Sequence, residues 1–192
     1  HEWWGNSVST HDHGAMWIHE SFTTYMEALY IECRYDYAEA VSYLKQQRRR
    51  IRNQHPIMGP LKVNYTSWPA SDMYYKGSWM LHTLRNSINN DSTWFQILGG
   101  LTDTFRHTVV NSQDIIGYIN THTERDYEPF FRQYLHHTDP PVFEYKVQEG
   151  KESSKQLAYR WSAAVEEYTM PVMVRINGQW HRLTPTQEWQ EL

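Results

Sequence analysis

Two patterns of hydrophobic and polar positions divide the chain near residue 140. Up to about residue 138, apolar side chains recur at the three- and four-residue spacing of amphipathic helices. From residue 140 onward, short segments alternate apolar and polar positions or are rich in β-branched and aromatic residues, as strands are. The change falls within "HHTDPPVFEYKV", where Pro140 and Pro141 end a helix and open an extended segment. We therefore predict two domains, residues 1–139 and 140–192.

The first part is expected to hold several helices with recognisable ends. The first helix spans residues 14–34, with Asp12 as a cap. One of its faces carries Trp17, Ser21, Tyr25 and Ala28. Further helices are expected over residues 36–54 and 73–88, from 91 to either 99–100 or 107, from Asn111 onward, and over 127–137.

The tail is expected to form four short strands, over residues 141–147, 155–161, 170–176 and 179–183. Asn177 and Gly178 between the last two strands are a strong signal for a two-residue β-hairpin turn. Four short strands without a helix are marginal alone, so we interpret them as the start of a β-domain. The fold class predicted from the pattern is thus mainly α, followed by a short antiparallel β segment.

Composition narrows the class of protein only slightly. Hydrophobic residues make up 40% of the 192 positions and charged residues 21%, as in a globular protein with a real core. The net charge of −4 gives no reason to expect nucleic acid as a partner, and we interpret the basic run "KQQRRRIR" as a solvated helix. Cys33, the single cysteine, excludes an intramolecular disulfide and a cysteine-rich zinc cluster, and is expected to be a small core residue. No apolar run approaches the roughly 20 residues that span a bilayer.

Two His-Glu pairs, His1-Glu2 and His19-Glu20, suggest zinc chemistry. A catalytic zinc site needs three protein ligands and one open position for water. The short motif H-E-x-x-H is absent, because Gly5 stands four residues after His1. Eighteen residues separate His1 from Glu20, which lies in "WIHESF".

The stretch "HEWWGNSVSTHDHGAMWIHESFTTY" resembles the aminopeptidase N-like zinc metallopeptidases, the family that includes leukotriene A-four hydrolase. Their pattern is H-E-x-x-H, eighteen residues, then Glu. The resemblance implies that His1 is the second zinc histidine and Glu20 the third zinc ligand. The first histidine and the catalytic glutamate would lie four and three residues before His1. Glu2 would then be a bystander, and His19 a structural neighbour of the ligand, since adjacent helical residues point about 100° apart.

A second motif supports the resemblance. The family has a tyrosine in Y-x-K-G that stabilises the oxyanion of the tetrahedral intermediate, and "MYYKGSWML" places Tyr74 three residues before Gly77. Tyr75 is the alternative register. The stretch from Asn111 to Pro141 is also similar to the family, and the tail matches its small β-sandwich. The resemblance implies the helical half of a thermolysin-like catalytic domain, followed by the start of a β-sandwich.

The resemblance implies a zinc-dependent aminopeptidase that hydrolyses N-terminal peptide bonds of a peptide substrate. The family motif G-x-M-E-N, which holds the free amine of the substrate, is missing, as are one ligand and the general base. We therefore expect this chain alone to bind zinc weakly and to be inactive. Localisation stays open. The alternative hypothesis is a non-catalytic helical binding or scaffold module that keeps the peptidase fold. We expect His11 and His13 to be loop residues that do not bind a metal.

Overall fold

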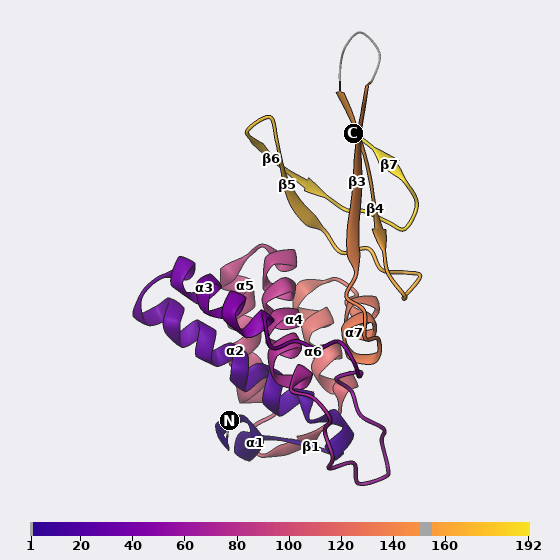
Figure 1. The fold of residues 1–192 in the computed structure, drawn as a ribbon. Coiled ribbons are helices and arrows are strands. Elements are labelled where there is room, and N and C mark those ends of the chain that lie inside the picture. The colour runs from indigo at the N-terminus through magenta and orange to yellow at the C-terminus, as the bar shows by residue number, and fades with distance from the viewer. Residues whose placement is uncertain (1, 150–154) are drawn as a thin grey trace.

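The computed structural model describes residues 2–149 and 155–192, and it consists of a helical body from one end of which β-strands project (Figure 1). The helices are α1 (Glu2–Ser7), α2 (Trp17–Arg34), α3 (Tyr37–Arg48), α4 (Asp72–Ile88), α5 (Asp91–Thr104), α6 (Ser112–Thr123) and α7 (Glu128–His136), with a 3-10 turn, η1 (His13–Ala15), before α2. The predicted fold class, mainly α followed by a small antiparallel β segment, is confirmed.

Helix α2 is the central element of the helical body, and its predicted apolar face is confirmed. Trp17, Ser21 and Tyr25 are fully buried, and Ala28 nearly so. The chain enters the helix through η1, because the Asp12 side chain accepts a hydrogen bond from the Gly14 backbone N–H and caps that short turn. The expected helix start at residue 14 is therefore three residues early.

Helices α2 and α4 cross at an unusually close contact. A Cβ atom built on Gly77 would lie 1.9 Å from Ser21 Oγ and 2.6 Å from Ser21 Cβ. The Ser21 hydroxyl donates a hydrogen bond of 2.8 Å to the Met73 carbonyl, one turn earlier on α4. Only a residue without a side chain permits this approach, so Gly77 sets the separation of the two helices.

An ionic network centred on a buried arginine joins the same two helices nearer to the end of α2. Arg85 of α4 is 3% exposed, and its guanidinium donates to Glu32 of α2 at 2.7 Å and to Asp91 at 2.8 Å. His82, one turn before Arg85, is buried against Tyr25 of α2, with 3.4 Å between His82 Nδ1 and the Tyr25 hydroxyl. Burial, and after it the positive charge of Arg85, lowers the pKa of His82 from 6.5 to about 4.

Helix α3 is shorter than predicted. The expectation of a helix to residue 54 is wrong, because α3 ends at Arg48 and the chain then turns. The carboxylate of Asp72, at the start of α4, accepts the backbone N–H groups of Arg52 and Asn53 at 2.8 and 2.7 Å. This distant contact replaces helical hydrogen bonds. The expectation for Cys33 is also wrong, since this residue is exposed at the end of α2.

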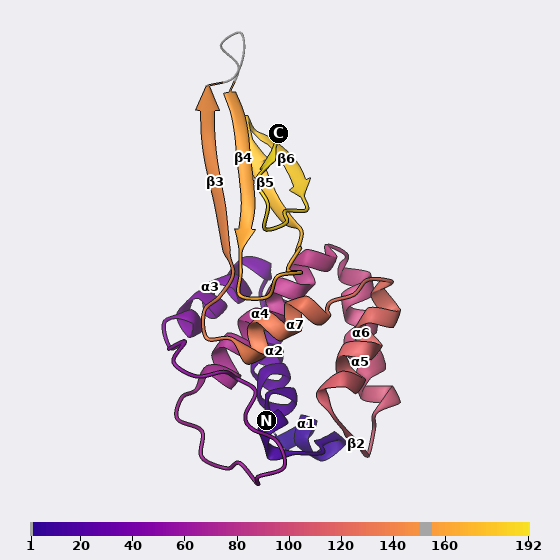
Figure 2. The same ribbon diagram turned by 90° about the vertical axis from the view of Figure 1, so that its right-hand side faces the viewer.

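The N-terminal segment pairs with a part of the chain about 100 residues away, which the sequence pattern did not indicate. Strand β1 (Val8–Thr10) runs parallel to β2 (Thr108–Val110), with Val8 opposite Thr108. Helix α1 precedes β1 and buries Trp4 against Phe22 of α2, with 4.6 Å between the ring centroids. Both elements lie at the end of the helical body away from the projecting strands (Figures 1 and 2).

The predicted strands are present in the tail as two antiparallel hairpins. Strands β3 (Val142–Glu149) and β4 (Lys155–Ser162) pair along their whole length and stand side by side in Figure 2. The predicted turn at Asn177 and Gly178 is confirmed, with φ of +50° and +85°, and it joins β5 (Val172–Ile176) to β6 (Gln179–Leu183). A two-residue strand, β7 (Gln190–Glu191), adds to the free edge of β4.

The segment between β4 and β5 ties the tail to the helices. Val165, Tyr168 and Met170 are buried within the same hydrophobic core as the helical body. Gln133 of α7 accepts the Val165 backbone N–H at 2.9 Å. The domain boundary at residue 140 stays a prediction, and it lies between the end of α7 and the start of β3. Within the described residues, no helix combines the length and the apolar character needed to cross a bilayer.

We expect the substitution Gly77→Ala to lower the free energy of unfolding by about 1–3 kcal/mol, because the added methyl group overlaps Ser21 and must push α2 from α4. The matched control is Gly99→Ala, an exposed position inside α5 with nothing within 4 Å of a built Cβ. Alanine there should be neutral or stabilising by about 0.5–1 kcal/mol. Urea unfolding of both variants gives the comparison, and equal effects would contradict the close helix crossing.

The buried His82 should make stability depend on pH. Its pKa is lowered in the folded chain, so the unfolded chain binds the extra proton first as the pH falls. The free energy of unfolding should therefore decrease between about pH 6.5 and pH 4, by up to about 3 kcal/mol from this residue. Urea unfolding across this range should show a shallower pH dependence for His82→Gln. Identical slopes for the variant and the unmodified chain would refute the assignment.

Candidate active site

Glu20 stands in the first turn of α2, on the side of the helix next to the buried face. The neighbouring Ser21 is fully buried in the crossing with α4, which holds the backbone of Glu20 in place. The Glu20 side chain is half-buried. Burial raises the pKa of this carboxyl, and a hydrogen bond with Tyr74 acts in the opposite direction.

Tyr74 lies in the first turn of α4, directly after Met73, the residue whose carbonyl accepts from Ser21. The helix crossing thus brings Tyr74 to Glu20, although 53 residues separate them in the sequence. The two side chains lie close enough for each to shift the pKa of the other. Burial, and then the Glu20 carboxylate, raise the pKa of the Tyr74 phenol, so its hydroxyl keeps its proton at neutral pH and remains a donor.

The lysine and the glycine of Y-x-K-G, Lys76 and Gly77, have structural roles here. Gly77 permits the helix crossing described above. Lys76 is 3% exposed, and its ammonium group donates to the carbonyls of His137 and Thr138 at 2.8 and 2.7 Å. These two bonds tie the start of α4 to the end of α7, and burial lowers the pKa of Lys76.

The second His-Glu pair divides into two roles. His19 points away from Glu20, toward the N-terminal segment, and its Nε2 accepts the Thr10 backbone N–H at 3.1 Å. Burial lowers the pKa of His19, and Gly5 of α1 packs on its ring so closely that a Cβ would lie 3.2 Å from Nδ1. His19 is thus a structural residue that holds β1 and α1 against α2.

His1, the other predicted zinc ligand, lies outside the described residues. Glu2 is exposed in the first turn of α1. Within residues 2–149 and 155–192, no group of three or more histidine, cysteine, aspartate or glutamate side chains is arranged to hold a metal ion. The donor that this part of the chain offers is the half-buried Glu20 carboxylate, whose oxygen atoms fit zinc as one ligand of several.

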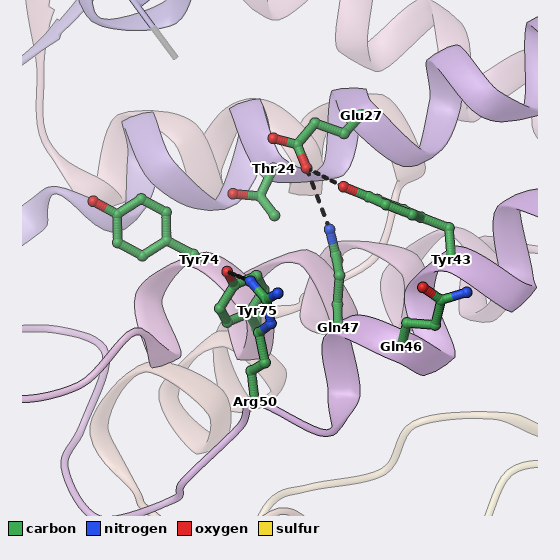
Figure 3. A pocket seen from close by; sticks show the side chains of 8 residues that line it. All are labelled: Thr24, Glu27, Tyr43, Gln46, Gln47, Arg50, Tyr74 and Tyr75. Carbon is green, nitrogen blue, oxygen red and sulfur yellow. Dashed lines mark hydrogen bonds between the residues drawn. The ribbon is translucent and has the colours of Figure 1, made fainter.

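A pocket of about 370 Å³ opens next to Tyr74 between α2, α3 and α4 (Figure 3). Thr24 and Glu27 follow Glu20 along the same side of α2 at helical spacing. The Glu27 carboxylate accepts the Tyr43 hydroxyl at 2.6 Å and the Gln47 amide at 3.4 Å. The pocket is lined by Thr24, Glu27, Tyr43, Gln46, Gln47, Arg50, Tyr74 and Tyr75.

Most of these pocket residues were missed by the sequence analysis. The spacing of Glu20, Thr24 and Glu27 was a usable signal, because positions four and seven residues apart share a helix face. The α3 residues gave no such signal, since their position depends on how α3 packs. That packing includes a hydrogen bond of 2.9 Å from the Trp79 indole of α4 to the Leu44 carbonyl.

A model of the peptidase family M1 domain matches residues 1–134. The match covers more than half of the chain, and the chain therefore belongs to peptidase family M1. This result confirms the resemblance found in the motifs around Glu20 and Tyr74. A sequence search of curated proteins gives no match.

Solved structures share the fold. The structure of Legionella pneumophila aminopeptidase A in complex with aspartic acid matches 99% of this chain with a TM-score of 0.76 and 15% identity. The M1 zinc metallopeptidase of Deinococcus radiodurans matches 73% of this chain with a TM-score of 0.61 and 21% identity. A mutant of that protein bound to a Tyr-Ser-Ala substrate matches equally well. The chain spans only 22% of the Legionella protein and 32% of the Deinococcus proteins.

Proposed function

We propose that this chain forms the C-terminal, helical part of the catalytic domain of a zinc-dependent aminopeptidase, together with the start of the following β-domain. The observation that carries the proposal is the meeting of Glu20 and Tyr74 beside a pocket, at a crossing that depends on Gly77. The family match and the shared fold support it. The substrate would be a peptide with a free N-terminus.

In this proposal Glu20 and His1 are zinc ligands, and the remaining ligand and the general base precede His1 in the protein. When bound, zinc polarises the scissile carbonyl and activates a water molecule. Tyr74 acts separately, because its protonated phenol donates a hydrogen bond to the oxygen that gains negative charge in the transition state. The Glu20 carboxylate lies beside this phenol and helps to keep it protonated.

Tyr74→Phe tests the catalytic role in a protein that includes the residues before His1. Removing one oxyanion donor should lower kcat by about 10²–10³-fold, while zinc content stays near that of the unmodified protein. The matched control is Tyr75→Phe, because the Tyr75 hydroxyl accepts from Arg50 and its ring lies 6.4 Å from that of Tyr74. That variant should lose at most a few-fold in kcat. A larger loss for Tyr75→Phe than for Tyr74→Phe would assign the role to the other register.

Glu20→Gln tests the metal ligand in the same protein. A carboxamide is a weaker zinc ligand than a carboxylate. Loss of a residue that only hydrogen-bonds to a zinc ligand lowers zinc affinity by about 10–100-fold, so loss of a ligand itself should lower the affinity by more than this. Glu27→Gln is the control, because Glu27 lies two turns further along the same side of α2 and is engaged with Tyr43. Metal analysis after dialysis should find zinc in the control and little in Glu20→Gln. Equal zinc content in both would remove Glu20 from the ligand set.

A further inference from the structure

A second pocket, of about 420 Å³, adjoins the one beside Tyr74 and has a strongly basic lining. The two pockets share Arg50 and Tyr75 in their linings, so they adjoin at this pair, and we refer to both together as the groove. The second pocket adds Arg49 and Arg52 to its walls, with Gln54, Pro69, Ala70 and Ser71. Three arginines therefore surround the part of the groove that lies beyond Tyr75.

Arg50 is held in position at the junction of the two pockets. Its Nη1 donates to the Tyr75 hydroxyl at 2.6 Å, and its guanidinium carbon lies 5.3 Å from the centre of the Tyr75 ring. Figure 3 shows Arg50 against Tyr75, away from Glu27 and Tyr43. A guanidinium that is already oriented loses less freedom when it binds an anion.

Among the residues that the structure describes, these arginines form no ion pair with an acid. None of the ion pairs among the described residues includes Arg49, Arg50 or Arg52. The nearby carboxylate of Asp72 is buried and accepts backbone N–H groups of residues 52 and 53. The lining thus offers guanidinium groups that have no carboxylate partner within the described part of the chain, and a guanidinium matches a carboxylate in geometry and charge.

The arginines lie within reach of the part of a peptide that follows the scissile bond. The Tyr74 ring is 6.4 Å from the Tyr75 ring, which is 5.3 Å from Arg50. An extended peptide covers this distance in about three residues. An aminopeptidase releases one N-terminal residue, so only the chain after the cleaved bond can extend so far. A free N-terminal ammonium group would also be repelled by the arginines.

We propose that Arg49, Arg50 and Arg52 bind a carboxylate of the peptide substrate, up to about three residues beyond the cleaved bond. The inference rests on the proposed function. The carboxylate is either the C-terminus of a short peptide or the side chain of an aspartate or glutamate. Glu27 lines the first pocket, and its carboxylate would repel an acidic residue of the substrate. An acidic substrate residue is therefore favoured only in the second pocket, beside the arginines.

Peptide binding measured by isothermal titration calorimetry in EDTA tests the inference without turnover. The probes are tetra-alanine as the free acid and as the C-terminal amide, and the amides of Ala-Ala-Asp-Ala and Ala-Ala-Asn-Ala. The free acid should bind about tenfold more tightly than the amide if the C-terminus is the ligand. The aspartate peptide should exceed the asparagine peptide if a side chain is the ligand. Either preference should weaken in 0.5 M salt.

The double variant Arg49→Gln and Arg52→Gln should reduce that preference to about twofold or less, because two of the three guanidinium groups are lost. The control Arg34→Gln removes the same kind of charge from an exposed position at the far end of α2, outside both pockets, and should keep the full preference. Far-ultraviolet circular dichroism and thermal unfolding of each variant establish that it is folded.

Equal or undetectable binding of all four peptides would overturn the inference, as would a preference that survives in the double variant. Tight binding of a single-stranded DNA oligonucleotide without any preference among peptides would instead make the groove a nucleic-acid surface. Release of N-terminal alanine by the zinc-loaded protein that includes the residues before His1 is scored separately. Its absence would reject the proposed function, whereas the binding preference is decided by the calorimetry alone.

Discussion

The close crossing of α2 and α4 is the constraint on which the rest of the site depends. With no side chain at Gly77, Ser21 can sit against the α4 backbone and donate to the Met73 carbonyl. Glu20 and Tyr74 are the immediate neighbours of Ser21 and Met73, so the same contact brings their side chains together. If α2 and α4 were further apart, the sequence would still contain Glu20 and Tyr74, but their side chains would no longer be in contact.

The motif Y-x-K-G therefore combines one chemical residue with two that build the fold. Lys76 donates hydrogen bonds to two backbone carbonyls after α7, and Gly77 sets the distance between α2 and α4. The same division applies to His19-Glu20, where the histidine fastens the N-terminal segment and the glutamate faces the site. In each case the structural partner immobilises the backbone of the reactive one, which is how a site gains a fixed geometry.

The sequence was sufficient where local patterns decide the structure. Helical spacing located α2 and its buried face, and the Asn177-Gly178 turn located a hairpin. The sequence was insufficient where contacts between distant residues determine the structure. At the end of α3, for example, the Asp72 carboxylate accepts backbone N–H groups of the segment after Arg48. Family motifs indicated Glu20 and Tyr74 as site residues. No local pattern could indicate that Tyr43 and Gln47 would meet Glu27, because this contact depends on the packing of α3 against α2.

The early end of α3 connects this structural correction to the function of the groove. A helix continued to residue 54 would spread its arginines over several faces, as a solvated helix does. Because the chain turns at Arg48 instead, Arg49, Arg50 and Arg52 come to one pocket beside Tyr75. Asp72, which ends the helix, also begins α4, and α4 carries Tyr74 two residues later. One carboxylate thus fixes the backbone beside Arg52 and stands at the start of the helix that carries the phenol proposed for catalysis.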